Sequence, residues 1–197
     1  MRIVLIIAWL FVGLAGVIYH YGPGQRNLKL DAVDRYLASA RQNVNEQNWI
    51  QANEDIDYAM AELPEGYDGR MQELRLEKAK IQMMNKELPA ARRALEELFR
   101  ELDNDPNSNG NLKALTRSAL ANSQYYITWL MRLEGLPKTE WEPVIESARQ
   151  HYRYLAENPN EYDVPLLADQ SKDDVESAIR LARMDLAELQ GLPLPAQ

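Results

Sequence analysis

The residues best suited to metal chemistry lie in one short polar segment. Asp105-Pro106-Asn107-Ser108-Asn109-Gly110 matches the first half of a calcium loop, in which oxygen ligands alternate and a glycine makes the sharp turn. The twelfth position of such a loop needs a bidentate Glu, and here it is Thr116. A single carboxylate without a closing ligand would bind the ion poorly. We therefore interpret the segment as an Asn/Gly turn and predict no metal site.

Candidate catalytic residues are few. The chain has two histidines, His20 and His151, and it contains no Gly-rich phosphate loop, nucleophile elbow or HExxH motif. His151 lies beside two tyrosines in a predicted helix, where a packed or surface histidine is more common than a base. We predict that the protein is not an enzyme and needs no cofactor.

The bulk composition limits the partners. The formal net charge is -8 and the predicted pI is about 4.9. An acidic chain gains little from releasing counterions on a phosphate backbone, so we do not expect nucleic acid as a partner. The chain has no cysteine, so its folding must rely on packing.

The N-terminal segment predicts a membrane anchor. Ile3 to Tyr19 is 17 residues long without a charge, and as a helix it would span roughly 26 Å of the ~30 Å hydrocarbon layer. A cleaved signal peptide is the alternative, but the apolar run continues beyond the small residues that cleavage would need. A buried core helix is disfavoured because Gly22-Pro23-Gly24 follows. We expect the lipid bilayer to contact Ile3, Trp9, Leu10, Phe11, Val17 and Tyr19.

The orientation of this anchor is set by few charges. Arg2 precedes the apolar run, and Arg26 and Lys29 follow it. One arginine before an apolar segment is typical of a signal anchor. We therefore expect a single-pass protein of the cell inner membrane with its soluble domain outside the cytoplasm, in the periplasm.

Two stripes of apolar residues organise the first half of the chain. Spacings of 3 and 4 place one side chain per turn on a single helix face. The stripes are separated by a constant 39 residues; they are Trp49, Ala52, Ile56, Ala59 and Leu63, and then Leu88, Ala91, Leu95, Leu98 and Leu102. The preceding segments match at the same offset, Leu37 with Leu76 and Ala40 with Ala79. A pattern that returns at a fixed offset indicates a repeat, here two helical pairs over 31–47 with 49–63, and 70–86 with 88–103.

These two pairs resemble the tetratricopeptide repeat. In that family a small residue lies midway along the first helix, a large apolar residue follows the turn, and alanines flank a large residue along the second helix. The residues that fit are Ala40, Trp49, Ala52, Ile56, Ala59 and Pro64 in the first pair, and Ala79, Leu88, Ala91 and Leu95 in the second. Leu98 replaces an alanine and the second closing proline is missing. The family period is about 34 residues, so a spacing of 39 implies about five extra residues in the loop 65–69. An unrelated array of helical hairpins would give similar stripes.

The rest of the chain predicts a third, degenerate pair and a terminal helix. Residues 112–133 form one long helix that is apolar on nearly every face in its second half, so it should lie in the middle of the array. We expect a looser turn after it. A capping box of Thr139 and Glu142 then starts a helix to about residue 158, with Trp141, Val144, Ala148, Tyr152 and Leu155 inward. Ser171 should cap the last helix, with an apolar stripe of Val175, Ile179, Ala182, Leu186 and Leu189 and a polar outer face.

The predicted fold is all-α. One N-terminal transmembrane helix precedes an α-α superhelix of about three tetratricopeptide-like hairpins and a C-terminal capping helix. The expected divisions are an anchor over 1–21, a linker over 22–30, the repeat domain over 31–190 and a flexible tail over 191–197.

The resemblance implies a concave groove that is lined by the first helix of each pair and holds extended peptides. Arg41 and Asn45 of the first pair, and Lys80 and Met84 of the second, map to it. The two basic residues could bind a carboxylate of the partner, or they could be solvated cations. An aromatic group could form a second surface, although we favour a core role for it; its members are Tyr125, Tyr126, Trp129, Trp141, Tyr152 and Tyr154.

The function predicted from this pattern is protein binding at a membrane. We expect a scaffold, an adaptor or an accessory subunit of a membrane-associated complex that binds a protein partner in the groove. The alternative is a purely structural subunit that uses convex or terminal-helix surfaces. A periplasmic small-ligand binder or an enzyme is the less favoured possibility.

Overall fold

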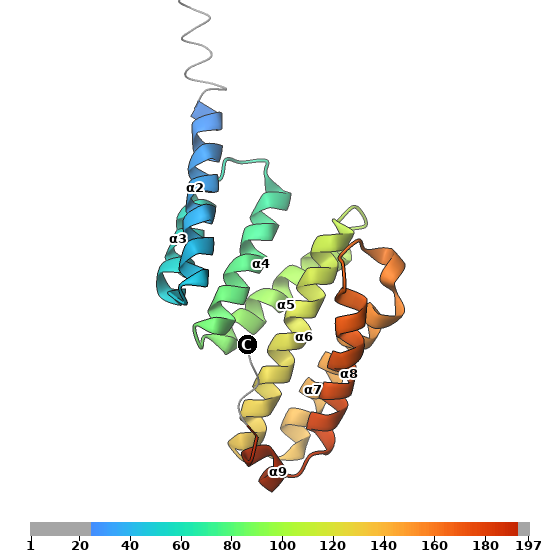
Figure 1. The fold of residues 1–197 in the computed structure, drawn as a ribbon. Helices are drawn as coiled ribbons and strands as arrows, with labels where there is room; N and C mark the ends of the chain where they lie inside the picture. Colours follow the sequence, from blue (N-terminus) through green and yellow to red (C-terminus); the bar gives the residue numbers. More distant parts are fainter. Residues whose placement is uncertain (1–24, 193–197) are drawn as a thin grey trace, which may run out of the picture. The chain divides into compact units, whose positions relative to one another are not determined.

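The computed structural model describes residues 25–192, and the regular elements in that range are all helical (Figure 1). They are α2 (Gln25–Asn45), α3 (Trp49–Glu62), α4 (Asp68–Met84), α5 (Leu88–Asn104), α6 (Gly110–Leu133), α7 (Lys138–Glu157), the 3-10 turn η2 (Pro159–Glu161), α8 (Leu167–Arg183) and α9 (Leu186–Gln190). No strand occurs among these residues, so the predicted all-α class is confirmed for the described part of the chain.

The predicted membrane anchor over 1–21 lies outside the described residues, and so do 22–24 of the expected linker and 193–197 of the expected tail. Between residues 25 and 192, none of the helices combines the length and the apolar character that crossing a bilayer requires.

Contacts divide the chain after Leu74 into two compact units, whereas the sequence predicts one repeat domain over 31–190. The first unit contains α2, α3 and the start of α4. The second contains the rest of α4 and all later elements. The boundary falls inside a helix and not in a linker.

The first unit is a helical hairpin with a polar contact across its interface. Its apolar contacts come from Val33, Leu37 and Ala40 on α2 and from Ala52, Ile56 and Ala59 on α3, all of them buried. Asp55 of α3 is only 6% exposed, and its carboxylate accepts hydrogen bonds from Ser39 (2.7 Å) and Asn43 (2.8 Å) of α2. A buried carboxylate with two donors resists being separated from them.

The start of α2 differs from the prediction. We expected a linker up to residue 30 and a cap at Asp31, but α2 begins at Gln25. No glycine or proline follows Gly24 until the helix has ended. Without a breaker, residues 25–30 continue the helix and Asp31 lies inside it.

The core of the second unit forms around α5 and α6. All five residues of the second apolar stripe are buried, together with Leu76, Ala79 and Met83 of α4. α6 lies between α5 on one side and α7 and α8 on the other (Figure 1). Its buried residues extend from Leu112 to Arg132, as expected of a helix in the middle of an array.

The same turn closes the first helix of all three pairs. In each turn one residue has a positive φ: Gln47 (59°), Lys86 (65°) and Gly135 (76°). The next N–H bonds five residues back, from Asn48 to Asn43, from Glu87 to Gln82 and from Leu136 to Met131. This is the Schellman arrangement. The looser third turn that we expected is therefore wrong, and α6 with α7 forms a third hairpin of the same kind.

The start of α7 also differs from the prediction. The capping box of Thr139 and Glu142 is absent, because α7 begins one residue earlier, after Pro137, with no side-chain cap. Glu142 instead pairs with Lys138 at 3.0 Å. Ile145 is buried where we expected Val144 to point inward.

The last predicted helix is two helices. α8 begins at Leu167, so Ser171 is a buried interior residue and not a cap. α8 ends at Arg183, and Asp185 then caps α9 by accepting the N–H of Glu188 at 2.7 Å. The predicted polar outer face is confirmed, since its residues are exposed: Lys172, Asp173, Glu176, Arg180, Arg183 and Glu188.

Candidate protein-binding groove

A pocket of about 260 Å³ lies between α4 and α6, within the second unit. Its lining consists of Lys80, Met83 and Met84 from α4 and of Leu115, Ser118, Ala119, Asn122 and Tyr126 from α6. The α6 residues recur every three or four positions, so they occupy one face of that helix. The pocket therefore lies where the first helices of two successive pairs come together.

The inner side of the pocket is apolar. Met83 and Ala119 belong to the buried core, and Leu115 and Tyr126 pack against it. Met84 is partly exposed at the pocket wall. Methionine is unbranched and polarisable, so a wall that contains two methionines can adapt to apolar side chains of different shapes.

The rim of the pocket carries one cation and one amide. Lys80 lies 2.8 Å from Glu77 in the preceding turn of α4, and both side chains are largely exposed. Such a pair contributes only about 0.5 kcal/mol, so Lys80 can exchange Glu77 for a partner's carboxylate. The Asn122 oxygen accepts a hydrogen bond from the Tyr152 hydroxyl at 2.6 Å. That bond directs the amide NH2 of Asn122 toward other acceptors, such as a peptide carbonyl.

Two tyrosines continue this face along α6. The rings of Tyr125 and Tyr126 meet edge to face at 5.8 Å. Burial raises the pKa of both hydroxyls, and Asp174 of α8 raises them further. Burial also raises the pKa of the Asp174 carboxyl. Both tyrosines therefore stay protonated at neutral pH and can donate hydrogen bonds.

The structure brings together two of the four predicted groove residues. Lys80 and Met84 line the same pocket. Arg41 and Asn45 are exposed on α2, in the first unit. Sequence reasoning missed Leu115, Ser118 and Asn122, although stepping back from Tyr126 by three or four residues at a time leads to each of them.

The aromatic group is divided between core and surface. Trp129, Trp141 and Tyr152 are buried, which confirms the core role for these three. Tyr125 and Tyr154 are partly exposed, and Tyr126 is the member that lines the pocket.

The calcium-like segment has a structural use. Asn109 caps α6 by accepting the N–H groups of Asn111 and Leu112. Gly110 lies so close to the Glu161 carbonyl that a Cβ there would be 2.8 Å from its oxygen. Asn111 accepts the N–H of Asp163 at 2.7 Å. The asparagines thus join the start of α6 to the loop after η2, and among residues 25–192 no group of three or more acidic or histidine side chains could hold a metal.

His151 is a packing residue. Its ring meets Phe99 of α5 edge-on at 5.3 Å. Arg117 of α6 lies over Phe99 (4.6 Å) and over Tyr154 (3.8 Å). Burial, and then the nearby Arg117, lowers the pKa of His151 to about 4, so the imidazole is neutral at pH 7. This cluster ties α5, α6 and α7 together.

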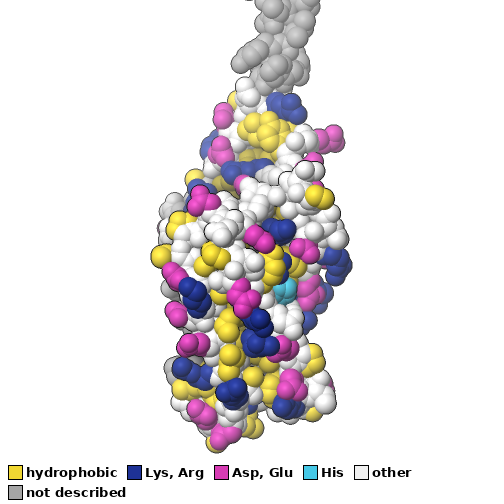
Figure 2. All heavy atoms as spheres, turned by 90° about the vertical axis from the view of Figure 1, so that its right-hand side faces the viewer, with side chains coloured by type: hydrophobic (Ala, Val, Ile, Leu, Met, Phe, Trp, Pro, Cys, Tyr) yellow, Lys and Arg dark blue, Asp and Glu magenta, His cyan; other side chains and the backbone are white. Residues whose placement is uncertain are grey.

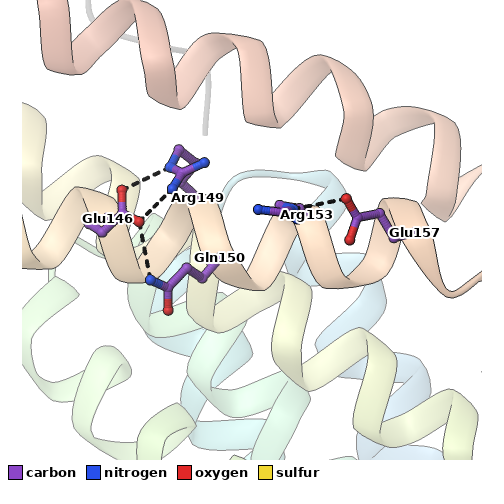
Figure 3. Close-up of polar contacts among 5 residues, drawn as sticks. All are labelled: Glu146, Arg149, Gln150, Arg153 and Glu157. Carbon is purple, nitrogen blue, oxygen red and sulfur yellow. Dashed lines mark hydrogen bonds and ion pairs between the residues drawn. The ribbon is translucent and has the colours of Figure 1, made fainter.

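The outer face of α7 carries charges that satisfy one another (Figure 3). Glu146 accepts hydrogen bonds from Arg149 (2.5 and 2.8 Å) and from Gln150 (3.1 Å). Arg153 pairs with Glu157 at 2.8 Å. All of these contacts join residues three or four apart on one helix, which is typical of a solvated face. We assign it no binding role.

Comparison with protein-family models, with curated proteins and with solved structures gives no match for this chain.

Proposed function

We propose that this protein is a membrane-anchored, tetratricopeptide-like scaffold, adaptor or accessory subunit, and that the pocket between α4 and α6 holds an extended segment of a partner protein. One observation carries the proposal. Lys80 and Met84, which the repeat pattern places in the groove, line a single pocket with one face of α6.

The size and chemistry of the pocket support a peptide as the ligand. Its volume of about 260 Å³ is below the range of about 300–1,000 Å³ that is usual for small-molecule and cofactor sites. An apolar side chain of the partner would enter between Met84 and Tyr126. A neighbouring acidic residue would replace Glu77 at Lys80, and Asn122 would bind the peptide backbone.

The anchor supports this function by concentration. The uncharged run Ile3 to Tyr19 would hold the helical domain at the inner membrane, facing the periplasm. Tethering raises the effective concentration of the groove for a membrane-associated partner to the millimolar range, so modest contacts suffice. Protease accessibility of the domain in intact cells and in spheroplasts tests this location. Cleavage only after lysis of the inner membrane would contradict it.

The binding experiment compares recovery of a partner from detergent-solubilised native membranes by the full chain and by its variants. Lys80→Glu reverses the charge at the rim, and Tyr126→Ala removes one wall. The matched control is Arg93→Glu, which makes the same charge change at an exposed position of α5 outside the pocket. We expect each pocket variant to lower recovery at least tenfold and the control to leave it unchanged. Equal recovery by Lys80→Glu and Arg93→Glu would reject the proposal.

A separate variant, Arg41→Glu, asks whether the first unit contributes to the same partner. If Arg41 lies on the partner's path, recovery falls as it does for Lys80→Glu. If recovery is unchanged, binding is confined to the second unit.

A further inference from the structure

α8 has two apolar lines, and only one of them is fully buried. Leu167, Ala178 and Leu181 are buried against the core of the second unit. Val175, Ile179 and Ala182 form a second line that is partly exposed, and it continues to Leu186, which is 44% exposed. The second line is the clean stripe that the sequence predicts to face inward.

The repeat explains what the second line is for. Each first helix has a small or short buried residue midway along it: Ala40, Ala79, Thr128 and, in α8, Ala178. In α4 the residues three before and four after Ala79 are Leu76 and Met83, which share a core with α5. In α6 the corresponding residue after Thr128 is Arg132, which lies 4.7 Å over the Trp141 ring of α7.

Val175 and Ala182 occupy these two positions in α8. In the other pairs the same positions face the second helix of the hairpin. The second helices α5 and α7 have 17 and 20 residues, but α8 is followed by α9, which has five. α9 buries Leu189 and closes one end of the core. It is too short to cover the second line of α8, so this face lacks the helix that the hairpin would supply.

The uncovered face has a pocket and unpaired cations. A hollow of about 400 Å³ at the end of α8 is lined by Glu176, Ile179, Arg180, Arg183, Met184 and Glu188. Arg180 and Arg183 are exposed, and neither forms an ion pair with another described residue. In the space-filling view, apolar side chains run between charged ones on the face over α7 and α8 (Figure 2).

We propose that this face of α8 binds an amphipathic α-helix of a partner protein, which takes the place of the missing second helix. The apolar stripe of that helix lies over Ile179 and Ala182, and its acidic side chains pair with Arg180 and Arg183. The helical form follows from the hairpin geometry, and the acidic character follows from the two unpaired arginines. The site is separate from the pocket between α4 and α6 and does not depend on the function proposed for that pocket.

The test uses the absence of cysteine from the chain. Ile179→Cys places a unique thiol on the proposed interface, and Lys172→Cys places a control thiol on the exposed start of α8. The rate of maleimide labelling of each full-length variant is measured in lysed native cells with their membranes and again after purification. We expect Ile179→Cys to react at least tenfold more slowly in the lysate than after purification, and Lys172→Cys to react equally in both.

Charge reversal tests whether the two arginines hold the partner helix. Arg180→Glu with Arg183→Glu, combined with Ile179→Cys, should restore fast labelling in the lysate. Lys80→Glu should leave the protection intact, because it affects the other pocket. Fast labelling of Ile179→Cys in the lysate would overturn the proposal. Slow labelling that persists in the dilute purified chain would overturn it too, since it would mean that the chain covers its own surface or that a second copy does.

A defined helix then tests the mode of binding. The probe is a synthetic peptide with the sequence of α5, Leu88–Asn104, which is a second helix of this fold with an apolar stripe and four acidic residues. We expect it to protect Ile179→Cys in the purified chain and not Lys172→Cys, and we expect a Leu95→Glu peptide not to protect it. Equal effects of the two peptides would reject an amphipathic helix as the occupant.

Discussion

Arg132 holds the end of α8, and replacing it by leucine should destabilise the second unit. The residue is only 8% exposed, and its guanidinium donates hydrogen bonds to the carbonyls of Leu181 and Met184 at the end of α8. It also lies over the Trp141 ring. Burial lowers the pKa of the guanidinium, and Asp185 partly opposes that shift. Arg132 thus supplies donors to carbonyls that the helix itself cannot satisfy.

The magnitude follows from these contacts. A hydrogen bond from a charged donor contributes about 1.5–3 kcal/mol, and a stacked cation contributes about 0.5–2 kcal/mol. Removing the buried charge recovers part of its desolvation cost. We therefore expect Arg132→Leu to lower the free energy of unfolding by about 3 kcal/mol. Arg132→Lys should lose roughly half as much, because it keeps the charge but not the planar fork.

Urea unfolding followed by far-UV circular dichroism measures the loss, and hydrogen exchange of Met184 to Leu189 shows where it occurs. The matched control is Arg153→Leu, which removes a guanidinium that is 59% exposed and paired with Glu157 on the same helix. The control should change stability by less than about 0.5 kcal/mol. If Arg132→Leu costs no more than Arg153→Leu, the guanidinium does not hold α8.

Three other predictions concern the turns, the first unit and acid stability. Lys86→Gly should stabilise the protein by about 0.5–1 kcal/mol and Gly135→Ala should destabilise it by about 1 kcal/mol, both by urea unfolding, because each position has a positive φ; effects of the same sign would show that the turns are not equivalent. Asp55→Ala leaves two donors of α2 without their acceptor, so hydrogen exchange in α2 and α3 should report a loss of about 1–3 kcal/mol; unchanged protection would contradict the interface described here. The folded-state pKa of His151, about 4 against an ordinary value of 6.5, means that the unfolded chain binds more protons between those values and stability falls as the pH drops from 6.5 to 4. His151→Gln should flatten that part of the stability curve, and an unchanged slope would show that His151 is not the group responsible.

Much of the helical framework could be predicted because its stripes are strictly periodic. Leu88 to Leu102 repeat at spacings of 3 and 4, and all five stripe residues are buried. The stripe from Val175 to Leu189 is equally regular, but α8 breaks before Leu186. Two causes of the break were hidden in the sequence. Asp185 suits a helix cap as well as a helix surface, and Arg132 acts from 49 residues away.

The candidate groove was predictable only in part, for a physical reason. Lys80 and Met84 follow from the offset of 39 residues between the first two pairs, and the equivalent turn residues Gln47 and Lys86 keep that offset. The third turn residue, Gly135, is displaced from Lys86 by 49 residues. Because α6 is longer than α4, the repeat register does not carry over to the α6 side of the pocket. Non-glycine residues at two of the three positive-φ positions also concealed that the turns are alike.

Occupation of the pocket between α4 and α6 is measured most directly by thiol labelling of Ser118→Cys in the full chain, with and without the recovered partner. Ser118 lines the pocket, and Gln150→Cys on the outer face of α7 is the control (Figure 3). If the pocket holds the partner, labelling of Ser118→Cys slows at least tenfold at saturation and labelling of Gln150→Cys does not change. Unchanged labelling of Ser118→Cys in a saturated complex would show that the partner binds elsewhere.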